Sequence, residues 1–267
     1  ERLEQKTKAI AQRAEACDGS WEAAFFVTLA RNYGFGINGD AFEQWAMCLP
    51  LQAVAHHRDN LFQVEAMFLG QAGLLNLDAI SACHRDEVLA DGYFSKLQHE
   101  YLYLKHKFGL NPIDHHLWRF LRLRPQNFPH IRIVQLARLY ATGQISLSHV
   151  LDCQTVKEAM KCLKSCVTLY WQTHYSFGVA SEKHLSTASL QLLVINTVIP
   201  MLFAYGRHIC KESLCERAFD FLEQLRPENN HIVRMWRDCS LEVAHAGDSQ
   251  ALIQLKNEYC DKKNCLR

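Results

Sequence analysis

Apolar residues recur at three- and four-residue spacing along almost the whole chain, which is the period of a helix with one buried face. Clear examples are residues 61–72 and 94–108. Helix-start signals precede several such segments, as where Asn60 and Gln63 form an Asn-x-x-Gln pair. Clear period-2 segments, typical of strands, are absent from the sequence. The pattern predicts an all-α fold, an irregular multi-helix bundle or α-hairpin array of about ten helices.

Two stretches interrupt the helical pattern. Residues 111–126 contain Pro112 and Pro125 and have little periodicity, so a subdomain boundary is expected there, with residues 176–186 as the alternative position. We therefore expect an N-terminal helical subdomain, 1–110, and a C-terminal one, 111–267. One continuous domain is the alternative.

The longest apolar run, residues 192–205, is about 14 residues long, shorter than the roughly 20 that span a bilayer. It predicts a buried core helix with a kink at Pro200, and no membrane segment. Its expected core residues are Leu193, Ile195, Ile199, Leu202 and Phe203. Asn196 lies inside this run, so its amide either bonds to backbone freed by Pro200 or lines a pocket.

Composition narrows the setting of the protein. Of 267 residues, 49% are hydrophobic, which is enough for a core without disulfides. The 11 cysteines are irregularly spaced, and many lie in or beside apolar helical segments, as free buried thiols do; this predicts a reducing, cytoplasmic location. The formal net charge of +1 gives no global attraction to nucleic acid or membranes, so such binding would need a local patch.

One such patch is the segment 115–151, which contains no Asp or Glu. A short helix, a turn and a helix starting at Pro129 would bring guanidinium groups together near a helix N-terminus, where phosphate or carboxylate binds. The competing interpretation pairs these arginines with acids such as Glu65, Glu87 or Glu100, as ties between helices. The candidate anion- or nucleic-acid-binding residues are Arg119, Arg122, Arg124, Asn127 and Arg132.

A second candidate is the aromatic segment 170–178. Aromatic rings with a histidine can line a ligand pocket, and the pocket candidates are Trp171, His174 and Tyr175, together with Asn196. The alternative is core packing, with His174 bonded to backbone.

Other motifs indicate no cofactor and no metal. Residues 34–39 match G-x-G-x-x-G, but no strand is expected before them, so we expect a helix-to-helix connection and not a dinucleotide site. His115-His116, Cys162 with Cys166, and Cys260 with Cys265 lack strong metal-site spacing. No motif of a catalytic triad or phosphate loop is present.

Several stretches resemble an uncharacterised bacterial family, the domain of unknown function family 2851. They are 65–75 (EAMFLGQAGLL), 123–133 (LRPQNFPHIRI), 170–178 (YWQTHYSFG), 193–206 (LVINTVIPMLFAYG) and 249–260 (SQALIQLKNEYC). The resemblance implies a longer protein, with a preceding strand-rich region that carries acidic and His residues and is similar to a nuclease core. It also implies a further Cys after residue 267. It brings no established activity.

These observations leave the function open between three hypotheses. The first is a non-catalytic helical interaction or scaffold domain of a larger cytoplasmic protein, which packs against the N-terminal domain that this chain lacks. The second is a nucleic-acid- or anion-binding module that uses the arginines of 115–151. The third is the helical part of a hydrolase- or nuclease-like enzyme whose catalytic residues lie outside this chain.

Overall fold

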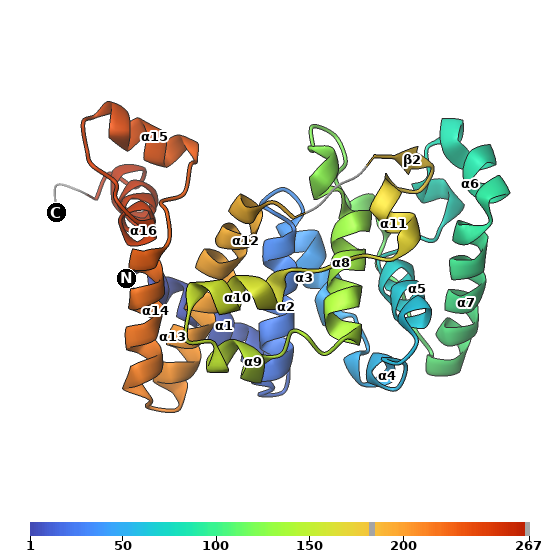
Figure 1. Cartoon of the computed structure of the whole chain (residues 1–267), viewed down its shortest axis with the longest axis horizontal. Helices are drawn as coiled ribbons and strands as arrows, with labels where there is room; N and C mark the ends of the chain where they lie inside the picture. The colour runs from blue at the N-terminus through green and yellow to red at the C-terminus, as the bar shows by residue number, and fades with distance from the viewer. Residues whose placement is uncertain (182–184, 265–267) are drawn as a thin grey trace. The chain divides into compact units, whose positions relative to one another are not determined.

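The computed structural model describes residues 1–181 and 185–264. Over these residues the fold is all-α, as the periodicity predicts. The α-helices are numbered α1 to α16, more than the ten or so expected (Figure 1). The chain divides into two compact units. Unit 1 comprises Glu1–Phe25, Leu147–Cys162 and Thr187–Arg267, and unit 2 comprises Phe26–Ser146 and Leu163–Ser186. This interleaved division differs from the expected one at residue 110, because each unit is completed by segments that return to it later in the chain.

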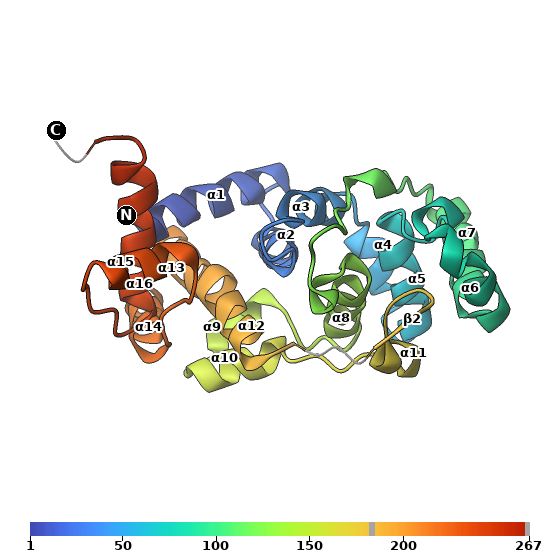
Figure 2. The ribbon, with the colours of Figure 1, turned by 90° about the horizontal axis from the view of Figure 1, so that it is seen from above.

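Unit 1 is organised around α13 (Ile199–His208), which packs against α14 (Glu212–Gln224) and α1 (Arg2–Ala16); Figures 1 and 2 show these neighbours. The expected core residues Leu193, Ile195, Ile199, Leu202 and Phe203 are all buried, which confirms that prediction. The other helices of unit 1 are α9 (Leu147–Asp152), α10 (Val156–Leu163), α12 (Thr187–Leu193), α15 (His231–Asp238) and α16 (Ala246–Gln254), with α16 continuing as a π-helix, Leu255–Cys260.

Just before Pro200, where a kink is expected, the structure has a π-helical segment, Val194–Val198, between α12 and α13. Proline has no N–H for the preceding turn, and a wider turn is one way for a helix to accommodate it. The continuous helix Thr187–His208 has 22 residues, more than the apolar run 192–205 alone, and is long and apolar enough to cross a membrane. Its most apolar window is 67% buried inside the structure, and buried core helices pass the same length test.

Unit 2 is organised around α5 (Leu61–Gln71), which lies between α7 (Tyr93–Phe108) and α8 (Pro129–Ala141) (Figure 1). Gly70 lets the ring of Tyr101 approach α5, since a Cβ there would lie 2.1 Å from that ring. The remaining elements include the 3₁₀ turns Leu77–Ala79, Ala82–His84, His115–Leu117 and Pro125–Asn127. They also include α3 (Gly39–Met47), α4 (Leu51–Ala55), α6 (Arg85–Asp91), α11 (Leu169–Thr173), and the strands β1 (His174–Ser176) and β2 (Val179–Ala180), which pair antiparallel.

The two central helices of unit 2 are covered on nearly every side. Residues 64–71 of α5 are all buried, and so is almost all of α8. Apolar side chains on every face of a helix require neighbours on every face. Consequently, the polar residues on these helices, among them Glu65 and Arg132, are drawn into the interior.

The G-x-G-x-x-G match lies in the connection between α2 (Trp21–Tyr33) and α3, as expected, and no strand precedes it. Gly36 has φ +97°, which suits glycine. Other local signals are confirmed too: Asn60 accepts from the backbone N–H of Gln63, and Pro129 is the first residue of α8.

Candidate anion-binding site

Residues 118–124, here called the arginine loop, have a backbone anchored at their first residues. The indole N–H of Trp118 donates to the carbonyl of Ala72 at 2.7 Å. The side chain of Asn38 bonds to both backbone groups of Arg119, accepting from its N–H at 2.8 Å and donating to its carbonyl at 2.9 Å. The ring of Phe120 packs on Phe128 and His130. The start of the loop therefore has a fixed position on unit 2.

The side chains of Arg119, Arg122 and Arg124 are exposed to solvent. Within the described residues none of them has an acidic partner within 4.0 Å, and the same holds for Arg132 and Arg138. The expected ties between these arginines and acids are therefore not formed in this part of the chain. Leu121, 83% exposed, projects from the same loop.

Arg132 is fully buried on α8, and no acidic side chain of the described residues lies within 4.0 Å of it. Its guanidinium donates to the amide oxygens of Gln135 and Asn127, both at 2.9 Å. Burial lowers the pKa of Arg132 to about 10, so the group still carries its charge at neutral pH. A buried charge bonded only to neutral amides costs free energy, because nothing compensates for its lost hydration.

Tyr33, the last residue of α2, and Phe35, in the connection that follows, complete the surroundings of this guanidinium. The ring of Phe35 covers it, with Cζ 4.6 Å from the ring centroid, and Phe35 has φ +42° in the glycine connection. Among the described residues, neither the buried hydroxyl of Tyr33 nor the buried Nε of Arg132 has a hydrogen-bond partner. Burial raises the pKa of Tyr33, while the charge of Arg132 opposes that shift. These unpartnered donors are groups that an anion could satisfy.

One detail of the expected arrangement is wrong. Residues 118–124 are a turn and not a short helix, since the 3₁₀ turn stops at Leu117 and Arg122 has φ +62°. Asn127 directs its amide oxygen at the guanidinium of Arg132 and accepts a hydrogen bond from it. Of the five candidates, Asn127 contacts both the guanidinium of Arg132 and the backbone carbonyl of Arg124. The side chains of the three loop arginines are exposed.

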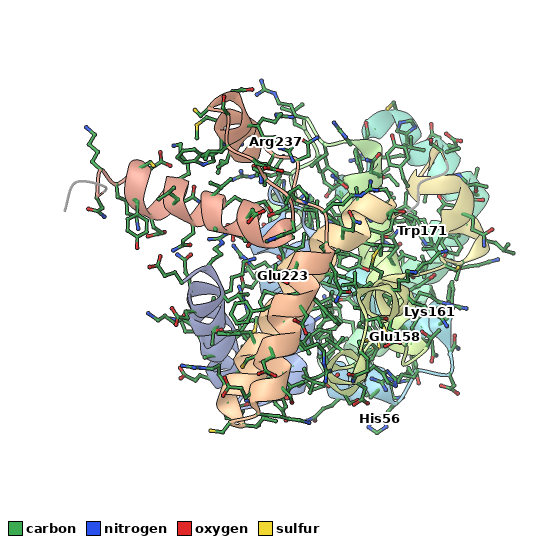
Figure 3. The ribbon with its side chains drawn as sticks, turned by 60° about the vertical axis from the view of Figure 1, so that its left-hand side comes forward. His56, Glu158, Lys161, Trp171, Glu223 and Arg237 are labelled. Atoms are coloured by element: carbon green, nitrogen blue, oxygen red, sulfur yellow. The ribbon has the colours of Figure 1, made fainter. Side chains whose placement is uncertain are left out.

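The aromatic candidates prove to be mainly packing residues. Trp171, on α11 (Figure 3), is fully buried, and Tyr175 packs edge-on against Phe128. His174 stacks on Tyr170 and its Nδ1 lies 3.0 Å from the carbonyl of Tyr170, the backbone partner that the alternative interpretation expects. A pocket of about 520 Å³ opens beside them, but Trp171, His174 and Tyr175 do not line it.

Asn196 belongs to unit 1, so the structure does not group it with the aromatic residues of unit 2. Its Nδ2 donates to the backbone carbonyl of Leu192 on α12. Its Oδ1 accepts from Nζ of Lys6, which also donates to Gln250. Burial lowers the pKa of Lys6 to about 7.

The possible metal ligands remain few. Asp114, His115 and His116 bring their ligand atoms within 4.8 Å of one another on an exposed turn, a grouping that the histidine pair alone did not indicate. Cys166 lies beyond the end of α10, so it does not share a helical face with Cys162, and Cys265 is outside the described residues. The described cysteines are free, but Cys48, Cys83, Cys166 and Cys239 are exposed and not buried as expected.

Sequence reasoning missed Glu65 as a site residue. Its carboxylate is 1% exposed and accepts from the hydroxyls of Tyr93 at 2.7 Å and Thr168 at 3.0 Å. Burial raises its pKa to about 7, against the smaller opposing effects of these two bonds and of Arg138. The available signal was the surrounding sequence VEAMFLG, whose apolar residues occupy every face of the helix.

Comparisons with known proteins give the family. No curated protein and no solved structure matches the chain. A family model described as "Protein of unknown function (DUF2851)" matches residues 1–231, and the stretch 249–260 lies outside that match. Because the match covers most of the chain, this protein belongs to the DUF2851 family.

Proposed function

We propose that the chain binds the phosphate backbone of nucleic acid through the arginine loop. The observation that carries this proposal is the set of exposed arginines, Arg119, Arg122 and Arg124, on an anchored loop without acidic partners among the described residues. Arginine suits phosphate because its planar fork donates two parallel hydrogen bonds.

Arg132 supports the proposal from inside unit 2. It bonds to Asn127, whose backbone N–H donates to the carbonyl of Arg124 at 2.8 Å. A buried charge is poorly screened by salt, so Arg132 adds to the positive potential near the end of the loop. The loop offers no helix or strand that would enter a groove, and backbone contacts carry little sequence information. We therefore expect binding with little sequence preference.

The test is a salt titration of binding to short DNA and RNA of mixed sequence, with fluorescence anisotropy as the readout. Replacing Arg119, Arg122 and Arg124 together by Gln should weaken binding at low salt by about tenfold or more. It should also reduce the slope of log K against log salt by about two to three, the value for three lost phosphate contacts.

A matched control removes the same charge elsewhere. Lys211, Arg234 and Arg237 are exposed on unit 1, and Figure 3 labels Arg237 on α15. Their joint replacement by Gln should leave most of the affinity and slope intact. Equal losses in both triple variants would show that binding depends on the net charge of the protein and not on the arginine loop. Absence of salt-dependent binding in the parent protein would contradict the proposal and leave the scaffold hypothesis.

A further inference from the structure

A pocket beside Glu65 includes none of the loop arginines and has no part in the proposed nucleic-acid binding. It lies in unit 2 where α5, α7 and α11 meet, and its volume is about 520 Å³. The described residues that line it are Phe62, Glu65, Tyr93, Thr168, Leu169, Tyr170 and Gln172. Most of this lining is aromatic or aliphatic, and Glu65 is its one carboxyl group.

The carboxyl group of Glu65 has a fixed orientation. The hydroxyl of Tyr93 holds Oε2 from α7, and the hydroxyl of Thr168 holds Oε1 from the residue before α11. No described cation lies within 4.0 Å of it; Arg138 on α8 acts on it only at longer range. A carboxylate with two oxygens has room for further donors beyond these bonds.

A buried carboxylate is stabilised most by a cationic donor. The aromatic and aliphatic walls favour an apolar body attached to that donor. Leu169, 81% exposed, stands at the rim, where it can cover such a body. We infer that this pocket binds an organic ammonium group carried on a hydrophobic body, with the ammonium on Glu65 and the body against Phe62, Tyr93 and Leu169.

Protonation of Glu65 should regulate this site. Burial raises the pKa of Glu65 to about 7, and the groups that face it are Tyr93 on α7, Arg138 on α8 and Thr168. Tyr93 stays protonated in the neutral range, because burial and the neighbouring carboxyl raise its pKa. Ammonium binding should therefore strengthen as pH rises from 5 to 8, when Glu65 ionises.

The experiment compares three probes of one shape by isothermal titration calorimetry on the whole chain: 2-phenylethylamine, 2-phenylethanol and phenylacetate. At pH 8 the amine should bind about tenfold or more tighter than the alcohol, and phenylacetate most weakly. Glu65→Gln should abolish the preference for amine over alcohol while leaving alcohol binding unchanged. Glu216→Gln, an exposed replacement on α14, serves as the control and should retain the preference.

A second variant provides an independent test if Glu65→Gln folds poorly. Leu169→Arg changes an exposed rim residue, so the fold should persist, and the added cation should weaken the amine by about tenfold and favour phenylacetate. Two further probes, Nα-acetyl-lysine methylamide and butylamine, identify the source of the ammonium group. Tighter binding of the lysine derivative would identify a lysine side chain, and equal binding of the two would identify a free amine. Equal affinity for amine and alcohol, or a preference that survives in Glu65→Gln, would overturn the inference.

Discussion

Glu65 and Arg132 lie on two helices of unit 2 that pack against each other, and the interior treats their charges differently. Neither forms an ion pair among the described residues. The carboxyl group can lose its charge by taking a proton, and its pKa of about 7 places that event near neutral pH. The guanidinium keeps its charge, because its pKa falls only to about 10. A buried acid is therefore adjustable by pH, whereas a buried arginine is a permanent source of positive potential.

The largest effect expected from this comparison is that of Arg132→Lys. Lysine keeps the charge but cannot reach both Asn127 and Gln135 with the same geometry. Hydrogen bonds to charged groups contribute about 1.5–3 kcal/mol, so the free energy of unfolding should fall by about 2–4 kcal/mol. Urea denaturation measures this loss. Arg138→Lys, on the same helix and half-buried, should cost much less; equal losses would show that the two bonds of Arg132 are not special.

Glu65→Gln should change the pH dependence of stability. The folded pKa of Glu65, about 7, is above the ordinary value of 4.5, so the folded protein binds the extra proton between these pH values. The parent protein should lose stability as pH rises through that window, and Gln cannot ionise. The stability of the variant relative to the parent should therefore rise by about 2–3 kcal/mol from pH 4.5 to 8. Urea denaturation of both proteins at several pH values measures this difference. A difference in unfolding free energy that stays constant with pH would contradict the prediction.

Phe35→Ala should have a smaller effect, about 1 kcal/mol, because it removes the ring over the guanidinium of Arg132. Phe35→Gly removes the same ring but also suits the φ of +42°, so it should be less destabilising than Ala. Thermal denaturation of the two variants decides the point. A glycine variant less stable than the alanine variant would show that the backbone conformation at residue 35 is not strained.

The smallest effect belongs to the arginine loop. Because Arg119, Arg122 and Arg124 are exposed and have no acidic partners among the described residues, replacing all three by Gln should change stability by less than about 0.5 kcal/mol. The same urea denaturation used for Arg132→Lys measures it. A loss above about 1 kcal/mol would indicate a structural role for these side chains and weaken the nucleic-acid proposal.

Periodicity was sufficient to predict the fold class, the buried helix around Leu202, and the helix-to-helix position of the glycine motif. These depend on local signals: apolar spacing, caps and turn residues. The site depended on which helices become central. The burial of Arg132 and Glu65 follows from α5 and α8 being covered on all sides, which local spacing does not reveal. The contact between Phe35 and Arg132 joins residues nearly a hundred positions apart, and no pattern in one sequence predicts such a pair.

The π-helical segment Val194–Val198 has a consequence for insertions and deletions. A π-turn contains one residue more than an α-turn, so it is the form that a single-residue insertion takes in an established helix. Removing one residue here would restore a regular α-helix while Leu202 and Phe203 kept their inward direction. Elsewhere in α12 or α13 the same deletion would rotate every later side chain by about 100°, the angle per residue in a helix with 3.6 residues per turn. Within the helix Thr187–His208, this short segment is thus the place where the loss of one residue is best tolerated. The loss would put at risk the bond between Asn196 and Lys6.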